Sequence, residues 1–366
     1  MASRILALVG DCYGARGGIA RYNQDLFEAL ADGGVEILIL PRLGDAAGIE
    51  LPPGIRQAAA IFNRLAFSSA AIVAAWRFRP IDVVFCGHVF MAPLAFVLAR
   101  LFGARYWLQA HGTDVWNDRN ALTRRLIEAA DLVSTVSRET RRILLAWVDL
   151  SPDRVRVLPD TVRDVFTPGS ARPGLRDALK LGPGPLLLTV ARLAASERYK
   201  GHEAIFSVLP ALRRDFPDLV HVVAGDGDDR ARLEAIAAEK VPGVVRFLGY
   251  VPDADLPDLY RLADLYVMPS TEEGFGIVYL EAAACGLRVI GGRGGGTADA
   301  IPDERVGAIV DPGDCEALRA AIVRQLRRGR ADPAAVEPYR RSHFTAAARA
   351  LYARLVAQPR RKKFGP

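Results

Sequence analysis

Short apolar runs alternate with helix-length amphipathic segments along almost the whole chain, and this alternation restricts the fold more than any other feature. The runs in the first half are RILALVG, VEILILP, IDVVFCG, ARYWLQA, LVSTV and RVRVLP, and those in the second half are PLLLTVAR, LVHVVAG, VVRFLG, LYVMPS, RVIGG and GAIVDP. Strands separated by helical segments are typical of βαβ units, which form parallel sheets covered by helices. The sequence therefore predicts an α/β protein with two Rossmann-like, doubly wound domains.

The 366 residues are too many for one ordinary hydrophobic core and suit two domains. The segment 167–185, TPGSARPGLRDALKLGPGP, is rich in proline and glycine, so we interpret it as a linker with a short helix near 175–181. We expect one Rossmann-like domain at 1–166 and a second at 186–335. A C-terminal helix within 336–366 is expected to cross back to the first domain. Ligands of such sheets bind at the carboxyl ends of the strands, in a cleft that two facing domains would share.

Composition and charge narrow the class of protein. The first apolar run, ILALVG, is too short for a secretory signal, and no run approaches the ~20 apolar residues that a membrane span needs. The four cysteines are scattered, without a CxxC pair or a histidine at metal spacing, which indicates a reduced, cytoplasmic protein without structural zinc. The net charge of +6 gathers at the end of the chain, where the tail RRKKFGP could meet anionic lipid or only solvent. Nucleic acid is not an expected partner, because the body of the chain lacks basic clusters with stacking aromatic residues.

Two motifs of the first half follow predicted strands. GDCYGARGGIARY places Gly17 and Gly18 before a helix predicted at 19–31, where the backbone can approach an anion. The glycines serve either a ligand or only a tight turn, and the spacing is not GxGxxG, which disfavours a dinucleotide fold. HGTD places His111 after the ARYWLQA strand, where it is either a structural histidine or a donor to a bound hydroxyl or phosphate.

Two cations follow the first strand of the second half. Arg192 stands at the end of that strand and Lys200 eight residues further on, just before a predicted helix. An arginine fork and a lysine point charge could together hold a diphosphate. The alternative is a pair of solvated surface cations.

The segment EEGFGIVYLEAAACG sets Glu273 and Glu281 eight positions apart. We expect a helix to begin near Phe275 or Gly276, so the carboxylates bracket a helix N-terminus whose free amides favour an anion. Carboxylates beside a phosphate site would bind hydroxyl groups, and a nucleotide-sugar combines sugar hydroxyls, a diphosphate and ribose hydroxyls. The alternatives are a carboxylate that complements the helix dipole at 273 and a half-buried helix charge at 281.

Two Asp-x-Asp pairs, at 226 and 228 and at 253 and 255, superficially match a metal-binding motif. Both stand where helices are predicted to start, and aspartate is a good helix cap. We therefore expect no metal and no cofactor other than the nucleotide-sugar donor substrate.

Seven motifs taken together resemble the family 4 retaining glycosyltransferases, which have the GT-B fold. In chain order they are GGIARY, HGTD, VARL followed by KG, VAGDGDD, VRFLGYV, LADLYVMPSTEEGFGIVYLEAAACG and GGTADAI. The resemblance covers nearly the whole chain, and the Glu273-x7-Glu281 spacing is its most specific element. One departure is LPDTVRDVF at 158–166, where many relatives have LPNGVD, so details of the acceptor side or the hinge are in doubt.

The resemblance implies a role for each candidate residue. Glu281 would bind the ribose hydroxyls and Glu273 those of the donor sugar, while Arg192 and Lys200 would hold the departing diphosphate. His111 would contact the sugar or brace the reacting face. Backbone amides would add further contacts at Gly17, Gly18, Phe275, Gly276, Ile277 and Val278. The base would lie near Tyr250 and Val251, which follow RFLG.

These observations predict a retaining, metal-independent glycosyltransferase that moves a hexose from GDP-mannose or a UDP-hexose to a cell-envelope polysaccharide or a lipid-linked acceptor. A nucleotide-sugar epimerase or hydrolase on the same fold is one alternative, and a non-catalytic sugar-nucleotide-binding protein is another. The sequence leaves the sugar, the base, the acceptor and the linkage open.

Residues 55–79 raise the further hypothesis of peripheral association with the inner face of an anionic membrane. No acidic residue lies between Glu50 and Asp82, whereas four arginines do. On a helical wheel of about 100° per residue, one apolar face collects Ile61, Leu65, Ile72 and Trp76, and the arginine side carries Phe67 and Phe78. Either the helix packs its apolar face on the sheet with solvated arginines outside, or phenylalanines beside arginines meet a lipid surface.

Overall fold

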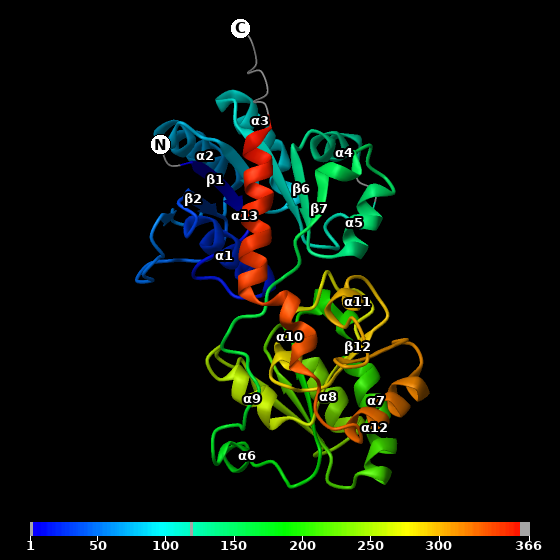
Figure 1. Cartoon of the computed structure of the whole chain (residues 1–366). Coiled ribbons are helices and arrows are strands. Elements are labelled where there is room, and N and C mark those ends of the chain that lie inside the picture. The colour runs from blue at the N-terminus through cyan, green and yellow to red at the C-terminus, as the bar shows by residue number, and fades with distance from the viewer. Residues whose placement is uncertain (1–2, 118–119, 359–366) are drawn as a thin grey trace. The chain divides into compact units, whose positions relative to one another are not determined.

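The computed structural model describes residues 3–117 and 120–358 of the chain (Figure 1). The basic tail at 360–366 lies outside the described residues. The chain forms two compact units, one made of residues 1–161 and 341–366 and the other of residues 162–340. The segment that we interpreted as a linker, 167–185, belongs to the second unit.

The first unit contains a parallel sheet of seven strands among its described residues, in the order β3-β2-β1-β4-β5-β6-β7. The strands are β1 (Arg4–Val9), β2 (Glu36–Pro41), β3 (Ile55–Gln57), β4 (Val83–Cys86), β5 (Arg105–Ala110), β6 (Leu132–Thr135) and β7 (Val155–Val157). The six apolar runs predicted as strands are confirmed. Strand β3 was not predicted, because three residues with one exposed arginine carry no periodic signal.

Helices cover both faces of the first sheet, as a doubly wound arrangement requires. The helices are α1 (Gly18–Ala31), α2 (Arg64–Phe78), α3 (Ala92–Phe102), α4 (Ala121–Glu128), α5 (Arg138–Leu145) and α13 (Arg341–Ala357), with short 3-10 helices η1 (Val89–Met91) and η2 (Pro152–Arg154). One core unites the strands with apolar residues of α2, α3, α4 and α5.

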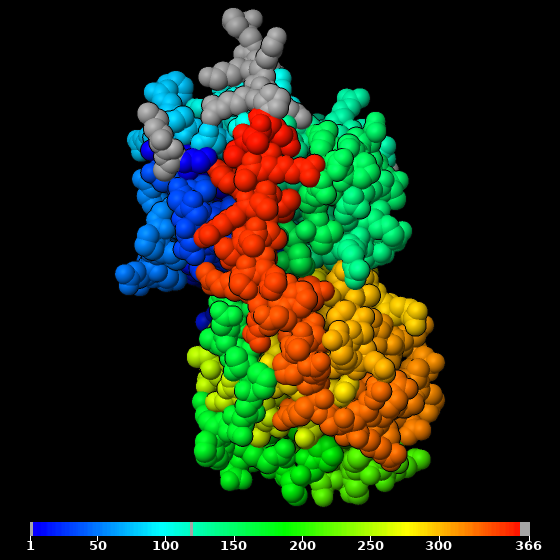
Figure 2. Space-filling view, in the orientation of Figure 1, coloured from blue at the N-terminus to red at the C-terminus, as the bar shows by residue number. Residues whose placement is uncertain are grey.

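Helix α13 lies beside α1 and returns the end of the chain to the first unit (Figures 1 and 2). The ring of Phe344 meets that of Tyr22 edge to face at 5.9 Å. Arg341 forms an ion pair with Glu28 at 2.7 Å, and Arg349 Nε donates to Ala29 O at 2.8 Å. The first unit is therefore completed by a segment that follows the second unit in sequence.

The second unit repeats the architecture with a parallel sheet that, within the described chain, has six strands in the order β10-β9-β8-β11-β12-β13. The strands are β8 (Leu186–Val190), β9 (Val220–Ala224), β10 (Val245–Gly249), β11 (Leu265–Met268), β12 (Val289–Gly292) and β13 (Gly307–Val310). The helices are α6 (Leu175–Ala178), α7 (His202–Asp215), α8 (Arg230–Lys240), α9 (Leu256–Leu262), α10 (Ile277–Ala284), α11 (Thr297–Ala300) and α12 (Cys315–Leu326), with η3 (Ala195–Lys200) and η4 (Pro333–Tyr339). The predicted α/β class with two parallel sheets is confirmed.

Strand order reverses direction at β1 in the first sheet and at β8 in the second. Strand β1 lies between β2 and β4, and β8 lies between β9 and β11. Where strand order reverses, the loops that follow the two neighbouring strands run to opposite faces of the sheet. The crevice between these loops, at the carboxyl edge of the sheet, has room for a ligand. No helix among residues 3–117 and 120–358 combines the length and the apolar composition that crossing a bilayer requires.

Helix α2 differs from the sequence-based interpretation in both its start and its orientation. It begins at Arg64, after Asn63, whose side chain accepts from the amides of Leu65 and Ala66, so Ile61 precedes the helix. Phe67 and Phe78 are buried with Ala71 and Ala75, whereas the face that we expected to pack on the sheet is exposed. The prediction of an apolar inner face through Leu65, Ile72 and Trp76 is therefore wrong. Small alanines let the helix approach the sheet closely, and the two phenylalanines fill the space at its ends.

This orientation predicts that two neighbouring truncations change the free energy of unfolding by very different amounts. Phe67→Ala should lower the free energy of unfolding by about 3–5 kcal/mol, because it opens a cavity in the core. Leu65→Ala should change it by less than about 0.5 kcal/mol, because Leu65 is 81% exposed. Urea unfolding followed by circular dichroism measures both variants, and equal losses would contradict the orientation.

Candidate active site

Parallel pairing of β8 with β11 sets two loops side by side at the carboxyl edge of the second sheet. The chain leaves these strands after Val190 and Met268, at neighbouring positions. Gly201, which follows Lys200, has φ +80°, and a Cβ there would lie 2.5 Å from Pro269 O. Only glycine fits both the conformation and the approach. The loop that carries Lys200 therefore lies directly against the loop that follows β11.

Glu197 lies between the two cations that the sequence singled out. Its Oε1 accepts from Arg192 Nη2, and its Oε2 lies 3.6 Å from Lys200 Nζ. The side chains of Glu197 and Lys200 are nearly buried, whereas that of Arg192 is 70% exposed. The cations thus share one internal carboxylate. Sequence reasoning missed Glu197, although it is the acidic residue within the segment RLAASERYK that separates them.

Glu273 completes this cluster from the β11 side. Its Oε2 lies 3.9 Å from Lys200 Nζ, which is too far for a hydrogen bond, and this buried oxygen accepts no hydrogen bond from any described residue. Burial raises the pKa of Glu273, Lys200 opposes the rise, and Glu197 adds to it. A buried carboxylate oxygen without a donor is costly. Hydroxyl groups of a ligand would supply the missing donor.

The N-terminus of α10 begins directly after Glu273. Gly276 precedes the helix with φ +92°, and a Cβ there would lie 2.5 Å from the ring of Tyr279. No side chain in the described part of the chain caps α10, so the backbone amides at Ile277 and Val278 face this end of the helix without side-chain competition. The helix start agrees with the expected one. The Phe275 side chain is buried against Tyr339, so any contact of Phe275 with a ligand would be through its backbone.

Glu281 lies in the second turn of α10 and is almost fully buried, at 1% exposure. Its Oε2 accepts from Tyr260 OH at 2.9 Å. Burial raises the pKa of Tyr266, and the charges of Glu273 and Glu281 add to this rise. The two carboxylates do bracket the helix start, but Glu281 is held by a tyrosine in the interior and is not an open surface group.

Tyr250 and Val251 follow β10, which lies two strands from β8 and three from β11. Tyr250 is exposed and Val251 is half-buried. Neighbouring strands are about 4.8 Å apart, so this position is roughly 14 Å from the end of β11 across the sheet. That span suits an elongated ligand such as a nucleotide-sugar lying along the carboxyl edge.

In the first unit, Gly17 and Gly18 stand at the N-terminus of α1. Gly17 has φ +111°, and a Cβ on either residue would meet no protein atom within 4 Å. By contrast, a Cβ on Gly14 would collide with Asp45 O at 1.9 Å. Gly14 therefore serves chain packing, while Gly17 and Gly18 leave the backbone of the helix end open to a ligand.

His111 follows β5 in the same unit. Its Nε2 lies 3.1 Å from Gly87 O, its ring meets Tyr22 edge to face at 5.4 Å, and its amide donates to Asp114. Burial lowers the pKa of His111 to about 3, so the ring is neutral near pH 7. A carbonyl partner requires the proton on Nε2, which leaves Nδ1 as an acceptor. In this geometry Nδ1 would meet a bound group as an acceptor, and the role of His111 at a ligand stays a prediction.

The Asp-x-Asp pairs make local contacts that differ from the predicted capping. Asp228 accepts from the Ala195 amide at 2.8 Å, Asp226 lies 3.7 Å from Arg230, and Asp255 pairs with Arg172 at 2.6 Å. Neither α8 nor α9 has a side-chain cap from the described residues. Both pairs stand at helix starts as expected, since Asp255 is the N-cap residue of α9 and Asp228 directly precedes Asp229, the N-cap residue of α8, but the side chain of Asp255 does not cap its helix. Among the described residues there is no group of three or more His, Cys, Asp or Glu side chains arranged to hold a metal ion.

Comparison with known families accounts for both units. The family described as Glycosyl transferases group 1 matches residues 175–341, and Glycosyltransferase Family 4 matches residues 16–164. The chain belongs to the family 4 glycosyltransferases. The resemblance stated from the motifs is confirmed.

Curated relatives of this family 4 chain act on several acceptors. A GDP-mannose-dependent alpha-(1-6)-phosphatidylinositol monomannoside mannosyltransferase of Mycolicibacterium smegmatis is 35% identical over 63% of this chain and 64% of its own length. A D-inositol 3-phosphate glycosyltransferase of Acidothermus cellulolyticus is 34% identical over 56% of this chain and 49% of its own. A glycogen synthase of Mycobacterium tuberculosis is 28% identical over 88% and 84%. The chain thus spans just under two thirds of the length of the mannosyltransferase.

Solved structures support the GT-B fold of the family 4 chain. Sucrose-phosphate synthase from Thermosynechococcus elongatus superimposes with a TM-score of 0.75 at 24% identity, over 97% of both chains. Anabaena HepE in complex with UDP-glucose superimposes with a TM-score of 0.77 at 17% identity, over 96% of this chain and 99% of its own.

The structure thus brings together Arg192, Lys200, Glu273 and the start of α10 at one edge of the second sheet. Glu281 is buried in the second turn of α10, and Tyr250 and Val251 follow β10 further along the same edge. Gly17, Gly18 and His111 belong to the first unit. The roles that the resemblance implies for these residues stay predictions.

Glu197→Gln should bind GDP and UDP about threefold to tenfold more tightly, a change of about 1 kcal/mol. The diphosphate would no longer compete with a carboxylate for Arg192 and Lys200. Isothermal titration calorimetry measures this affinity. Glu203→Gln is the matched control, because Glu203 pairs with Arg232 on the same unit. Weaker binding by Glu197→Gln would show instead that the carboxylate organises the cations for the ligand.

Three histidines should stay neutral from about pH 8 to about pH 5. Burial lowers the pKa of His111 to about 3, that of His202 to about 4 and that of His221 to about 3, from 6.5. Each folded pKa is below the unfolded one, so their contribution to stability is full above about pH 6.5 and is lost as the pH falls toward the folded values. Nitrogen-15 NMR of the rings should show no titration of these residues above pH 5, and a His111 transition near 6.5 would contradict the assigned geometry.

Proposed function

We propose that this protein transfers a hexose from a nucleotide-sugar, GDP-mannose or a UDP-hexose, to a cell-envelope polysaccharide or lipid-linked acceptor, with retention of configuration and without a metal ion. The observation that carries this proposal is the cluster of Lys200, Arg192 and Glu273 at the carboxyl edge of the second sheet. Lys200 lies within 4 Å of the Glu273 oxygen that lacks a hydrogen-bond donor, and Glu197 pairs with both Lys200 and Arg192 there.

Departure of the nucleoside diphosphate would be the step that this cluster assists. As the bond to the anomeric carbon breaks, negative charge grows on the diphosphate, and Arg192 and Lys200 would stabilise it. The amides at Ile277 and Val278 would add to this stabilisation at the helix end. Glu273 would orient the sugar by accepting from its hydroxyls.

GDP-mannose is the first donor to test, since two curated relatives of this chain are named as GDP-mannose-dependent mannosyltransferases. The HepE complex with UDP-glucose supports UDP-hexoses as the second group. Glu281, buried against Tyr260, would reach the ribose only where the bound nucleotide covers that part of α10. Its replacement by glutamine keeps the volume and tests the hydroxyl contact with less damage to the core than alanine.

Retention is tested by analysis of the product, and metal independence by the rate in the presence of a chelator. Proton NMR of the product reports the anomeric configuration, and an inverted product would overturn retention. Equal rates with and without EDTA are expected, and activity restored only by added Mg²⁺ or Mn²⁺ would overturn metal independence. We place the reaction in the cytoplasm at the inner face of the membrane, as part of the same proposal.

Lys200→Ala should lower kcat about 10²–10³-fold, because the variant loses a cation that acts on the departing diphosphate. Lys240→Ala is the matched control, since Lys240 is an exposed lysine at the end of α8. Release of GDP or UDP from a panel of nucleotide-sugars, with a membrane extract as the source of acceptor, measures the rate. Equal rates in the two variants would overturn the role of Lys200.

The same assay without acceptor separates the alternative functions. Turnover of the donor at full rate without acceptor would indicate an epimerase or a hydrolase. Donor binding, seen as an increase in melting temperature, without any turnover would indicate a non-catalytic binding protein.

A further inference from the structure

Helix α2 presents a stripe of large apolar side chains to solvent. Because successive helical residues turn by about 100°, Leu65, Ile72 and Trp76 share one side, opposite the buried Phe67 and Phe78. Leu65 and Trp76 are 81% and 60% exposed. Tryptophan and leucine on the surface at this density are unusual for a helix that only covers a sheet.

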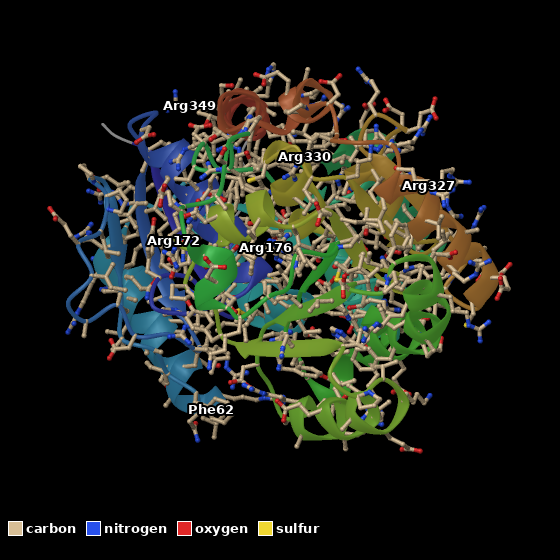
Figure 3. The ribbon with its side chains drawn as sticks, turned by 90° about the horizontal axis from the view of Figure 1, so that it is seen from below. Phe62, Arg172, Arg176, Arg327, Arg330 and Arg349 are labelled. Carbon is tan, nitrogen blue, oxygen red and sulfur yellow. The ribbon has the colours of Figure 1, made fainter. Side chains whose placement is uncertain are left out.

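The stripe extends beyond α2 at both ends. Phe62, just before the helix, is 74% exposed and is labelled in Figure 3 on the segment that leads into α2. On the neighbouring helix α3, Leu101 is 53% exposed, and the ring of Phe102 meets that of Trp76 at 6.4 Å. We call the exposed apolar residues of 62–76 and of α3 the α2 face. It is a continuous surface of the first unit and not a set of isolated side chains.

Arginines surround the α2 face and are not neutralised locally. Arg64, Arg77 and Arg79 are exposed, and none of the three has a carboxylate within ion-pair distance among the described residues. The guanidinium of Arg79 lies 3.9 Å from the centre of the Trp76 ring. The whole stretch from 51 to 81 contains no acidic residue. Apolar side chains that insert between lipids and cations that stay at the headgroup level match this pattern.

A cavity of about 220 Å³ adjoins the face and shares Phe62 with it. It opens at the carboxyl ends of β1, β2 and β4, and Arg42 lies in its wall. The guanidinium of Arg42 packs on the rings of Phe62 and Phe90, at 5.4 and 5.6 Å, and its buried Nε has no hydrogen-bond partner among the described residues. The wall also includes Asp11 and His88, and Arg42 is its one cation that a phosphate-bearing lipid headgroup could engage among the lining residues.

We propose that the α2 face docks on an anionic lipid bilayer. Charge complementarity favours lipid over a protein partner, because Arg64, Arg77 and Arg79 border the apolar residues without a carboxylate within ion-pair distance among the described residues. Since Phe62 belongs both to the face and to the cavity wall, docking holds the cavity at the depth of the headgroups. There a lipid-linked phosphate could reach Arg42. The identity of this lipid as an acceptor rests on the proposed function, whereas the docking itself does not.

Flotation of the full chain with vesicles tests the proposal. Binding is expected to vesicles of phosphatidylcholine with phosphatidylglycerol in low salt, with loss of binding in high salt and with phosphatidylcholine alone. Leu65→Ser with Trp76→Ser should abolish flotation. Each of Arg64→Ala, Arg77→Ala and Arg79→Ala should weaken binding about fivefold.

Controls use exposed residues of the second unit. Val165→Ser matches the apolar change, and Arg327→Ala, at the end of α12 (Figure 3), matches the loss of a charge. Both controls should float like the unaltered chain. No flotation of that chain in low salt, or flotation of the double variant, would overturn the proposal.

Light scattering without vesicles tests the alternative that a second copy of the chain binds the α2 face. A dimer of the unaltered chain that Leu65→Ser with Trp76→Ser dissociates would show that the face binds a second copy, which would also overturn docking on lipid. Binding of GDP and UDP should be unchanged in the double variant. Failure of flotation with intact nucleotide binding therefore counts against docking alone, and loss of donor turnover with intact flotation counts against the proposed function alone.

Discussion

The chemistry of the second unit depends on the close approach of the loops that follow β8 and β11. A side chain at position 201 would collide with Pro269 O, so the loop carrying Lys200 can approach the other loop this closely only because residue 201 is glycine. That approach puts one ammonium group within 4 Å of both Glu197 and Glu273. Glu197 and Lys200 from the loop after β8 and Glu273 from the loop after β11 become one coupled set, and a change at any of these charges alters the electrostatics of the others.

Shared charge also explains why this cluster suits an anionic ligand. Two nearly buried carboxylates around Lys200 leave Glu273 with a raised pKa and an oxygen that lacks a donor. A diphosphate would take Arg192 and Lys200 from Glu197, and sugar hydroxyls would satisfy Glu273. A nucleotide-sugar would thus satisfy the cations and the Glu273 oxygen together, and its binding energy could be used to orient the sugar.

Much of this architecture could be predicted from the sequence, and the failures have physical causes. Alternation of strands and helices predicted both sheets, and the start of α10 followed from Gly276. The helical wheel of α2 separated two faces correctly but could not tell which is inside, because burial depends on what the sheet accepts. A stripe of alanines with Phe67 and Phe78 fits closely, whereas the more hydrophobic stripe through Leu65 and Trp76 does not. Glu197 was missed because its importance lies in a loop conformation, which residue spacing does not encode.

Protonation ties donor binding to pH through Glu273. Its folded pKa is raised by burial, so the carboxylate is more easily protonated than an exposed one. A ligand whose hydroxyls donate to Glu273 stabilises the charged form and lowers that pKa. By linkage, such a ligand binds more tightly as the pH rises through the pKa of Glu273 and less tightly as the carboxylate takes up a proton. His111 adds nothing to this dependence near neutral pH, because its ring is already neutral there. Under the proposed role of Glu273, the pH response of donor affinity would thus come from the second unit, where the carboxylates and their shared lysine lie.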